Sequence, residues 1–183
     1  MISEEEIEFY KTIIHELNIV FDVGCGDDNI FDELKPGIEA HLFDPLTNKH
    51  LLPKIEGKKN IKYNNFGLGS KRAMMKFHPA YYSILLRNDV KRFTDHSEIE
   101  IFVDTVDNYC EGKKINKIDL LKIDTEGFDL EVIMGSVNML DKIKYIQFED
   151  WTNELTLETL QLLTPYKDKI VFNSNPKNYF ITL

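Results

Sequence analysis

"DLLKIDTEGFDLEVIMG", residues 119–135, carries the two signals that decide the fold. Its first part is an apolar run interrupted by Lys122, which is typical of a strand buried on both faces of a parallel sheet. After Gly127 the apolar residues recur at helical spacing. Asp124 and Glu126 stand between the two parts. The stretch therefore predicts a buried strand that ends at two carboxylates and leads directly into a helix.

Strand patterns alternate with helical patterns along the rest of the chain. Such alternation predicts a parallel sheet with helices on both faces. Residues 168–183 indicate instead two strands joined by a short turn, which requires antiparallel pairing. Residues 70–100 are rich in aromatic and basic side chains and have no clean period, so we expect an insertion over the sheet edge that binds substrate. The predicted fold is one α/β domain, 1–183, with a doubly wound, mostly parallel sheet and a C-terminal antiparallel hairpin.

The composition argues against several kinds of protein. The 183 residues are 43% hydrophobic and carry a formal net charge of −9, so we expect a folded chain that does not bind nucleic acid. No apolar run is long enough for a membrane span, and the acidic start "MISEEEIEFYK" is unlike a signal peptide. Cys25 and Cys110 are too few for a disulfide framework or a metal cluster. We therefore expect a cytoplasmic protein with reduced thiols and no metal site.

"FDVGCG", residues 21–26, brings a glycine turn to the end of the first predicted strand. It places Asp22, Gly24, Cys25 and Gly26 at the carboxyl end of that strand. Glycines there let the backbone approach a ligand closely, and the following helix can offer N–H groups. An ordinary tight turn is the alternative, because a Gly-x-Gly alone is a weak signal.

Asp44 ends the second predicted strand, and Pro45 follows it. A carboxylate at that place can accept both hydrogen bonds from a ribose diol. A nicotinamide dinucleotide would favour a third glycine in the turn, where this chain has Asn29, and Asp27 and Asp28 would repel its pyrophosphate. S-adenosylmethionine has no phosphate and is cationic at its sulfonium and ammonium groups. The charges therefore favour S-adenosylmethionine over NAD.

Taken together, these motifs resemble one family, the FkbM-type S-adenosylmethionine-dependent methyltransferases. The most specific match is "IDLLKIDTEGFDLEVIMGS", residues 118–136, which resembles the family's Lys-Ile-Asp-x-Glu-Gly element and the helix after it. The resemblance runs in order from about residue 20 to about residue 150. The shorter matching segments are "FDVGCG", "HLFDP", "NNFGLGS", "DTVDNYC" and "IQFED".

The resemblance implies a Rossmann-like methyltransferase fold and a cofactor site. Asp44 would hold the ribose of S-adenosylmethionine, and Asp124 and Glu126 would lie beside its methyl group. Since the family mostly methylates oxygen, we expect an O-methyltransferase acting on a hydroxyl of a sugar, a glycan or a small metabolite. The implied cofactor-binding residues are Asp22, Gly24, Cys25, Gly26, Asp44, Pro45, Asn65, Phe66, Gly67 and Asp124.

Methyl transfer to a hydroxyl needs an aligned acceptor and gains from a base that takes its proton. Asp124 and Glu126 stand at the strand end, where either could be that base, and His78 is a further candidate. The alternative for both acids is to cap the N–H groups of the following helix, and for Asp129 we expect no more than that or contact with solvent. We expect Lys122 to be the charge partner of a site acid.

Aromatic and polar side chains in the expected insertion suit a sugar-like acceptor, and a tryptophan beside acids could stack on a sugar ring. The alternative is that several of them pack the insertion onto the sheet. The candidate substrate residues are Tyr81, Tyr82, Ser83, Arg87, Glu149 and Trp151.

Two other functions stay open at this point. One is a short-chain NAD-dependent oxidoreductase, against which stand the missing third glycine and the expected absence of any Tyr-x-x-x-Lys pair. The other is a methyltransferase-like domain that binds a partner without catalysis. The acceptor, the position methylated and the oligomeric state are not specified by the residues.

Overall fold

The computed structural model describes residues 4–27, 30–46, 49–79, 97–149, 161–165, 170–172 and 178–183. Its main sheet has seven strands in the order β3-β2-β1-β7-β8-β10-β9. The first five in that order are parallel, and β10 runs antiparallel to both of its neighbours. The strands are β1 (Ile19–Val23), β2 (Glu39–Phe43), β3 (Ile61–Asn64), β7 (Ile118–Ile123), β8 (Ile143–Glu149), β9 (Ile170–Phe172) and β10 (Asn178–Thr182). The predicted doubly wound, mostly parallel sheet with a C-terminal antiparallel pair is confirmed.

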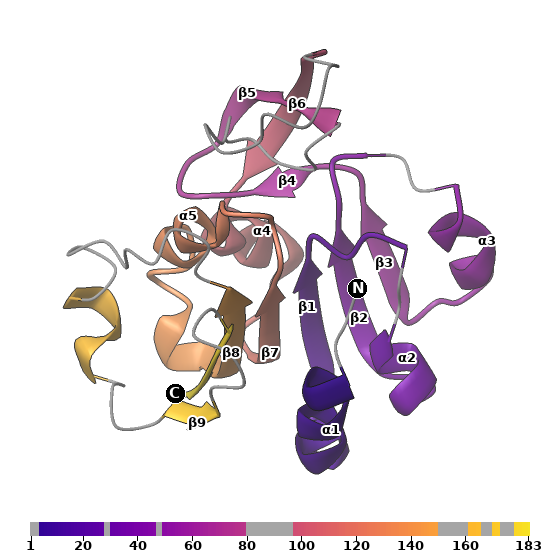
Figure 1. The fold of residues 1–183 in the computed structure, drawn as a ribbon, viewed down its shortest axis with the longest axis vertical. Coiled ribbons are helices and arrows are strands. Elements are labelled where there is room, and N and C mark those ends of the chain that lie inside the picture. Colours follow the sequence, from indigo (N-terminus) through magenta and orange to yellow (C-terminus); the bar gives the residue numbers. More distant parts are fainter. Residues whose placement is uncertain are drawn as a thin grey trace.

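Helices cover both faces of this sheet (Figure 1). One face is packed by α1 (Glu4–Ile13) and α2 (Ile30–Leu34), whose apolar side chains contact Val20 and Leu120. The other face is packed by α4 (Val106–Lys113) and α5 (Asp129–Met134), which contact Phe21 and Leu121. Adjacent residues of β1 and β7 therefore point to opposite helix layers. This is why all six residues of β7 are buried, as the apolar run predicts.

Shorter elements connect these layers. A 3₁₀ turn, η1 (Ile14–Glu16), extends α1, α3 (Leu51–Ile55) covers the outer end of β2, and η3 (Leu140–Lys142) leads into β8. Thr105 caps α4 by accepting a hydrogen bond from the N–H of Asn108 over 3.0 Å. The helix after β7 is shorter than the sequence pattern predicts. It ends before Gly135, where a Cβ would come 2.0 Å from the backbone oxygen of Gly69.

A second, three-stranded sheet stands beyond the carboxyl ends of the parallel strands (Figure 1). It consists of β4 (Gly67–Leu68), β6 (Ile99–Asp104) and β5 (Ala73–Phe77), in that order. The pattern of "NIKYNNFGLGS", residues 60–70, predicts a single strand, and this is wrong because β3 and β4 belong to different sheets. The expectation that 70–100 is irregular is also wrong in part, since it contains β5 and the start of β6. Residues 80–96 lie outside the described residues, so the insertion's role in substrate binding stays a prediction.

Within the described part of the chain, no helix is long and apolar enough to cross a membrane. Both cysteines are buried free thiols, and burial raises the pKa of Cys110 to about 12.

Candidate active site

The carboxyl ends of the parallel strands form a rim at which the candidate residues meet. The sheet order changes direction beside β1, with β2 and β3 on one side and β7 and β8 on the other. Asp22 of β1 pairs with Lys122 of β7, and Lys122 pairs with Gln147 of β8. The strand that leads to Asp124 is therefore the direct neighbour of the strand that carries the glycine turn. In open α/β sheets, such a switch point is where ligands bind.

The glycine turn lies directly against the end of β7. Gly24 has a φ of +78°, and a Cβ there would come 1.9 Å from the backbone oxygen of Asp124. Gly26 has a φ of +52°, but a Cβ there would meet nothing within 4 Å, so space is open beside the turn. Asp44 accepts hydrogen bonds from the N–H of Gly26 over 3.1 Å and from the N–H of Leu46 over 2.8 Å. The turn and the carboxylate at the end of β2 are thus bonded to each other, and burial raises the pKa of Asp44.

A buried ion pair stands directly below the rim. The Lys122 side chain is 2% exposed, and its Nζ lies 2.9 Å from Asp22 Oδ1 and 3.8 Å from Asp124 Oδ2. Burial lowers the pKa of Lys122, but the charges of Asp22 and Asp124 outweigh it and raise that pKa well above its usual value. Lys122 therefore stays an ammonium. This geometry agrees with the predicted partnership between Lys122 and a site acid.

The N-terminal helix completes the floor of the site. The hydroxyl of Tyr10 donates to Gln147 Oε1 over 2.8 Å, and Gln147 Nε2 donates to Glu6 Oε1 over 3.3 Å. Gln147 lies beside Lys122 in the strand register. Asp22, Lys122 and Gln147 form a polar row under the rim. Tyr10 and Glu6 of α1 contact this row through Gln147.

The loop between β7 and α5 holds a conformation that is unusual for its sequence. Glu126 has a φ of +54° and Gly127 a φ of +104°, and a left-handed backbone costs a residue other than glycine roughly 1–2 kcal/mol. The N-cap of α5 is Phe128, whose own side chain makes no capping hydrogen bond. The capping alternative for Asp124 and Glu126 stays a prediction. Strained backbone of this kind is frequent at functional sites.

Asp129 has a larger role than the sequence indicates. It is 1% exposed, and its Oδ2 accepts hydrogen bonds from Thr125 N over 3.2 Å and from Thr125 Oγ1 over 2.6 Å. Its Oδ1 accepts a hydrogen bond from the N–H of Glu149 over 3.0 Å. The expectation that Asp129 serves only the helix end or solvent is wrong. The side chain joins the loop after β7 to the end of β8.

Glu149 ends β8, opposite Asn178 of β10, and its side chain is partly buried. Burial, followed by the charges of Asp124 and Asp129, raises the pKa of Glu149 to about 7. Its place in the sequence predicts a substrate contact and not a base. The signal that could have marked it is its position at the end of the strand next to β7.

The segment after β3, residues 65–67, lies partly at the rim and partly in the core. Asn65 lies at the rim, where its side-chain amide donates to the backbone oxygen of Pro45 over 3.0 Å. The ring of Phe66 packs edge-on against Phe43 with centroids 5.8 Å apart, and Gly67 begins β4. Among these three residues, Asn65 is the one that the structure bonds to the end of β2.

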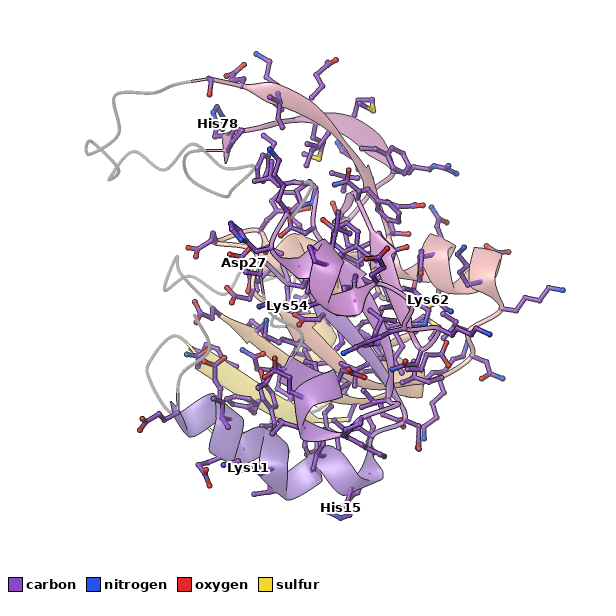
Figure 2. All side chains as sticks on the ribbon, turned by 90° about the vertical axis from the view of Figure 1, so that its right-hand side faces the viewer. Lys11, His15, Asp27, Lys54, Lys62 and His78 are labelled. Carbon is purple, nitrogen blue, oxygen red and sulfur yellow. The ribbon has the colours of Figure 1, made fainter. Side chains whose placement is uncertain are left out.

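His78 lies outside the rim. It is buried just after β5, with Nε2 3.9 Å from Glu98 Oε1. Figure 2 shows it on the second sheet, well above Asp27 of the glycine turn. Cys25 packs into the core beside Leu42, so it can offer only its backbone to a ligand. The predicted substrate residues that lie outside the described residues are Tyr81, Tyr82, Ser83, Arg87 and Trp151.

A metal site and a Tyr-x-x-x-Lys pair are two further possibilities. Among the described residues, no group of three or more His, Cys, Asp or Glu side chains is arranged to hold a metal ion. A Tyr-x-x-x-Lys spacing does occur in the chain, at Tyr109 and Lys113 of α4. The Tyr109 hydroxyl, however, lies 2.8 Å from His41 Nδ1 and donates to Asn64 Oδ1 over 3.2 Å. These bonds hold it in the packing between α4 and the sheet, away from the glycine turn.

A doubly wound sheet with a glycine turn after β1 and acidic residues after β2 and β7 defines the Rossmann-like methyltransferases. The family model of the methyltransferase FkbM domain matches residues 20–170, and the chain belongs to this family. A crystal structure of methyltransferase FkbM from Methylobacillus flagellatus KT shares the fold, with a TM-score of 0.58 and 13% sequence identity. The match covers 92% of this chain and 44% of the crystallised chain. A search of curated proteins finds no match.

Proposed function

We propose that this protein is an S-adenosylmethionine-dependent O-methyltransferase that acts on a hydroxyl of a sugar, a glycan or a small metabolite. One observation carries the proposal. At the switch point of the sheet, Gly26 is bonded to Asp44 over 3.1 Å, and Gly24 lies against the backbone of Asp124. The glycine turn therefore contacts both Asp44, the proposed ribose-binding carboxylate, and Asp124, the proposed carboxylate on the acceptor side.

The residues at the rim fit S-adenosylmethionine. Asp44 would accept hydrogen bonds from its ribose, and the backbone from Gly24 to Gly26 would pass its methionine part, where space is open beside the turn. The carboxylates at the rim complement the positive charge of the donor, whereas a pyrophosphate would face Asp27 and the rim acids unfavourably. When bound, S-adenosylmethionine supplies an electrophilic methyl group.

The protein's own contribution is then alignment and proton removal. A rigid rim holds the acceptor hydroxyl in line with the methyl carbon, which can lower the barrier by several kcal/mol. Asp124 lies between the glycine turn and β8, so we assign it to orienting the acceptor hydroxyl. Glu126 follows in the strained loop, and we assign it to the same acceptor side.

Ligand-induced thermal stabilisation tests the cofactor. The protein is heated alone, with S-adenosylmethionine, with S-adenosylhomocysteine and with NAD. Both sulfur ligands are expected to raise the melting temperature, because a ligand at about 100 times its Kd stabilises the folded state by about 2.7 kcal/mol. Asp44→Ala is expected to lose this shift, and Glu100→Gln, on the exposed part of β6, to keep it. A shift with NAD alone, or with no ligand, would overturn the proposal.

Transfer of a labelled methyl group tests the reaction. Deoxysugar nucleotides, amino-sugar nucleotides and free glycans serve as acceptors, with product analysis by mass spectrometry. We expect a mass gain of one methyl group on a hydroxyl. Cofactor binding without transfer to any acceptor would favour the non-catalytic binding domain instead.

A further inference from the structure

Glu149 stands in the same row as the glycine turn and Asp124. Asp22, Lys122 and Gln147 pair side by side in β1, β7 and β8. Gly24, Asp124 and Glu149 each lie two residues after one of them. The ladder continues to Asp124, whose N–H donates to the oxygen of Val23 over 2.9 Å. Because residues two apart in a strand point to the same face, Asp124 and Glu149 both face the side that carries α1.

This row divides the rim into a donor side and an acceptor side. The glycine turn and Asp44 occupy the ends of β1 and β2, where the proposed function places the methyl donor. The ends of β7 and β8 are left for the acceptor, with Asp124 in between. Glu149 is therefore the carboxylate at the far end of the row, beside the acceptor.

The surroundings of Glu149 differ from those of Asp124. Asp124 has the buried ammonium of Lys122 at 3.8 Å. Glu149 has burial and like charges around it, and these raise its pKa to about 7. A base with a pKa near the working pH combines a populated charged form with enough basicity to accept a proton. The charged groups that face Glu149 come from the end of β7, the following loop, α5 and α1, and they are Asp124, Glu126, Asp129 and Glu6.

We propose that Glu149 is the general base that accepts the proton of the acceptor hydroxyl, an inference that rests on the proposed function. In the balanced step, the acceptor oxygen bonds to the methyl carbon and its O–H proton passes to the Glu149 carboxylate. The C–S bond of the donor breaks with its electron pair remaining on sulfur. This assigns proton removal to β8, and Asp124 and Glu126 orient the acceptor.

Asp129 is the positioning residue for this base. Its carboxylate bonds Thr125 with one oxygen and the N–H of Glu149 with the other, so it fixes the end of β8 relative to the loop after β7. Asp129 does not face the reacting atoms itself. Its loss would let Glu149 and Asp124 move apart without removing either side chain.

The pH dependence of kcat/KM for the acceptor tests the base. For the wild-type protein, we expect kcat/KM to fall as the pH drops below about 7, where Glu149 takes up a proton. Glu149→Gln should lower kcat by about 10²–10⁴-fold and abolish this acidic limb, with the affinity for S-adenosylmethionine unchanged by calorimetry. Glu149→Asp should restore part of the rate together with the limb. Asp129→Asn should lower kcat and keep the limb but move it to lower pH, because it removes a like charge that raises the pKa of Glu149; a merely structural effect on cofactor binding would not move the limb.

Controls separate this inference from the proposed function. Glu111→Gln removes an exposed carboxylate from the last turn of α4, outside the rim and the expected insertion, and should leave both the rate and the profile unchanged. Carboxyl NMR titration of the free protein adds a measurement independent of turnover, in which one glutamate should titrate near pH 7 and be missing from Glu149→Gln. If the wild type transfers methyl groups but Glu149→Gln keeps the full rate and the limb, the base assignment is overturned and the methyltransferase stands. If no acceptor is methylated, the proposed function fails, and a Glu149 that titrates near 4.5 overturns the inference separately.

Discussion

Replacing Glu149 with glutamine is expected to stabilise the folded protein at alkaline pH while leaving its stability near pH 4 almost unchanged. The pKa of Glu149 in the folded state is raised from 4.5 to about 7. Below 4.5 the group is protonated in both the folded and the unfolded state. As the pH rises to about 7 the unfolded state loses its proton first, so the folded wild type becomes progressively less stable relative to the variant.

The size of this effect follows from the shift. At about 1.4 kcal/mol per pKa unit, the upper limit is about 3 kcal/mol. Because Glu149 is only partly buried and solvent screens its neighbours, we expect about 1–2 kcal/mol. Urea denaturation of both proteins at pH 4 and pH 8.5 gives the difference in the free energy of unfolding at each pH. For a chain of this length, that difference corresponds to a rise in melting temperature of about 2–4 °C per kcal/mol.

Glu100→Gln is the matched control, since it removes a glutamate from an exposed strand and should show no difference between the two pH values. The reasoning about Glu149 is refuted if its glutamine variant is equally stable relative to the wild type at both pH values, or is more stable only at the acidic one. A confirmed result would show one substitution that lowers turnover and raises stability, as expected where an active site carries an unfavourable charge.

Four other substitutions test the geometry of the rim. Gly24→Ala should destabilise the fold by about 2 kcal/mol or more in urea denaturation, because its Cβ would collide with the backbone of Asp124. At Gly26 the Cβ of an alanine would face open space, so Gly26→Ala should lower the free energy of unfolding by only about 1 kcal/mol, from backbone strain. Lys122→Met should lower the free energy of unfolding by about 3–5 kcal/mol, because it leaves a buried carboxylate uncompensated, and an unchanged value would mean that this pair is not buried as described. Asp44→Asn should weaken S-adenosylmethionine binding at least about tenfold by calorimetry, since one ribose hydrogen bond to a charged group contributes about 1.5–3 kcal/mol; equal affinity would place the ribose elsewhere.

The sequence predicts the parts of this site that depend on local pattern. The apolar run before Asp124 predicts a buried parallel strand, since a strand covered on both faces shows no alternation. Lys122 interrupts that run, and a lone cation in a buried strand needs a carboxylate nearby, which Asp22 supplies. Gly24 is likewise predictable as a place of close approach, because a turn directly after a buried strand brings the backbone to the next strand.

Other features depend on contacts that no local pattern contains. Asp129 looks like an ordinary acid in a first helical turn, and its role is visible only when β8 is placed beside the loop, because its partner Glu149 is 20 residues away. The position of Glu149 depends on strand register, which a one-residue shift would reverse. The second sheet was missed for the same reason, because β4 pairs with β6 across a long intervening segment. The edge-on packing of Phe66 against Phe43 likewise depends on a contact between separate elements, and its implied role in cofactor binding stays a prediction.

The floor of the site depends on a helix that lies outside the family match. That match begins at residue 20, whereas α1 spans Glu4–Ile13 and lies ahead of it. Even so, α1 supplies Glu6 and Tyr10 to the polar row beneath the rim. Glu6 is also among the charges that raise the pKa of Glu149. Removing that charge from α1 would therefore lower the pKa of Glu149 without changing any residue of the matched core.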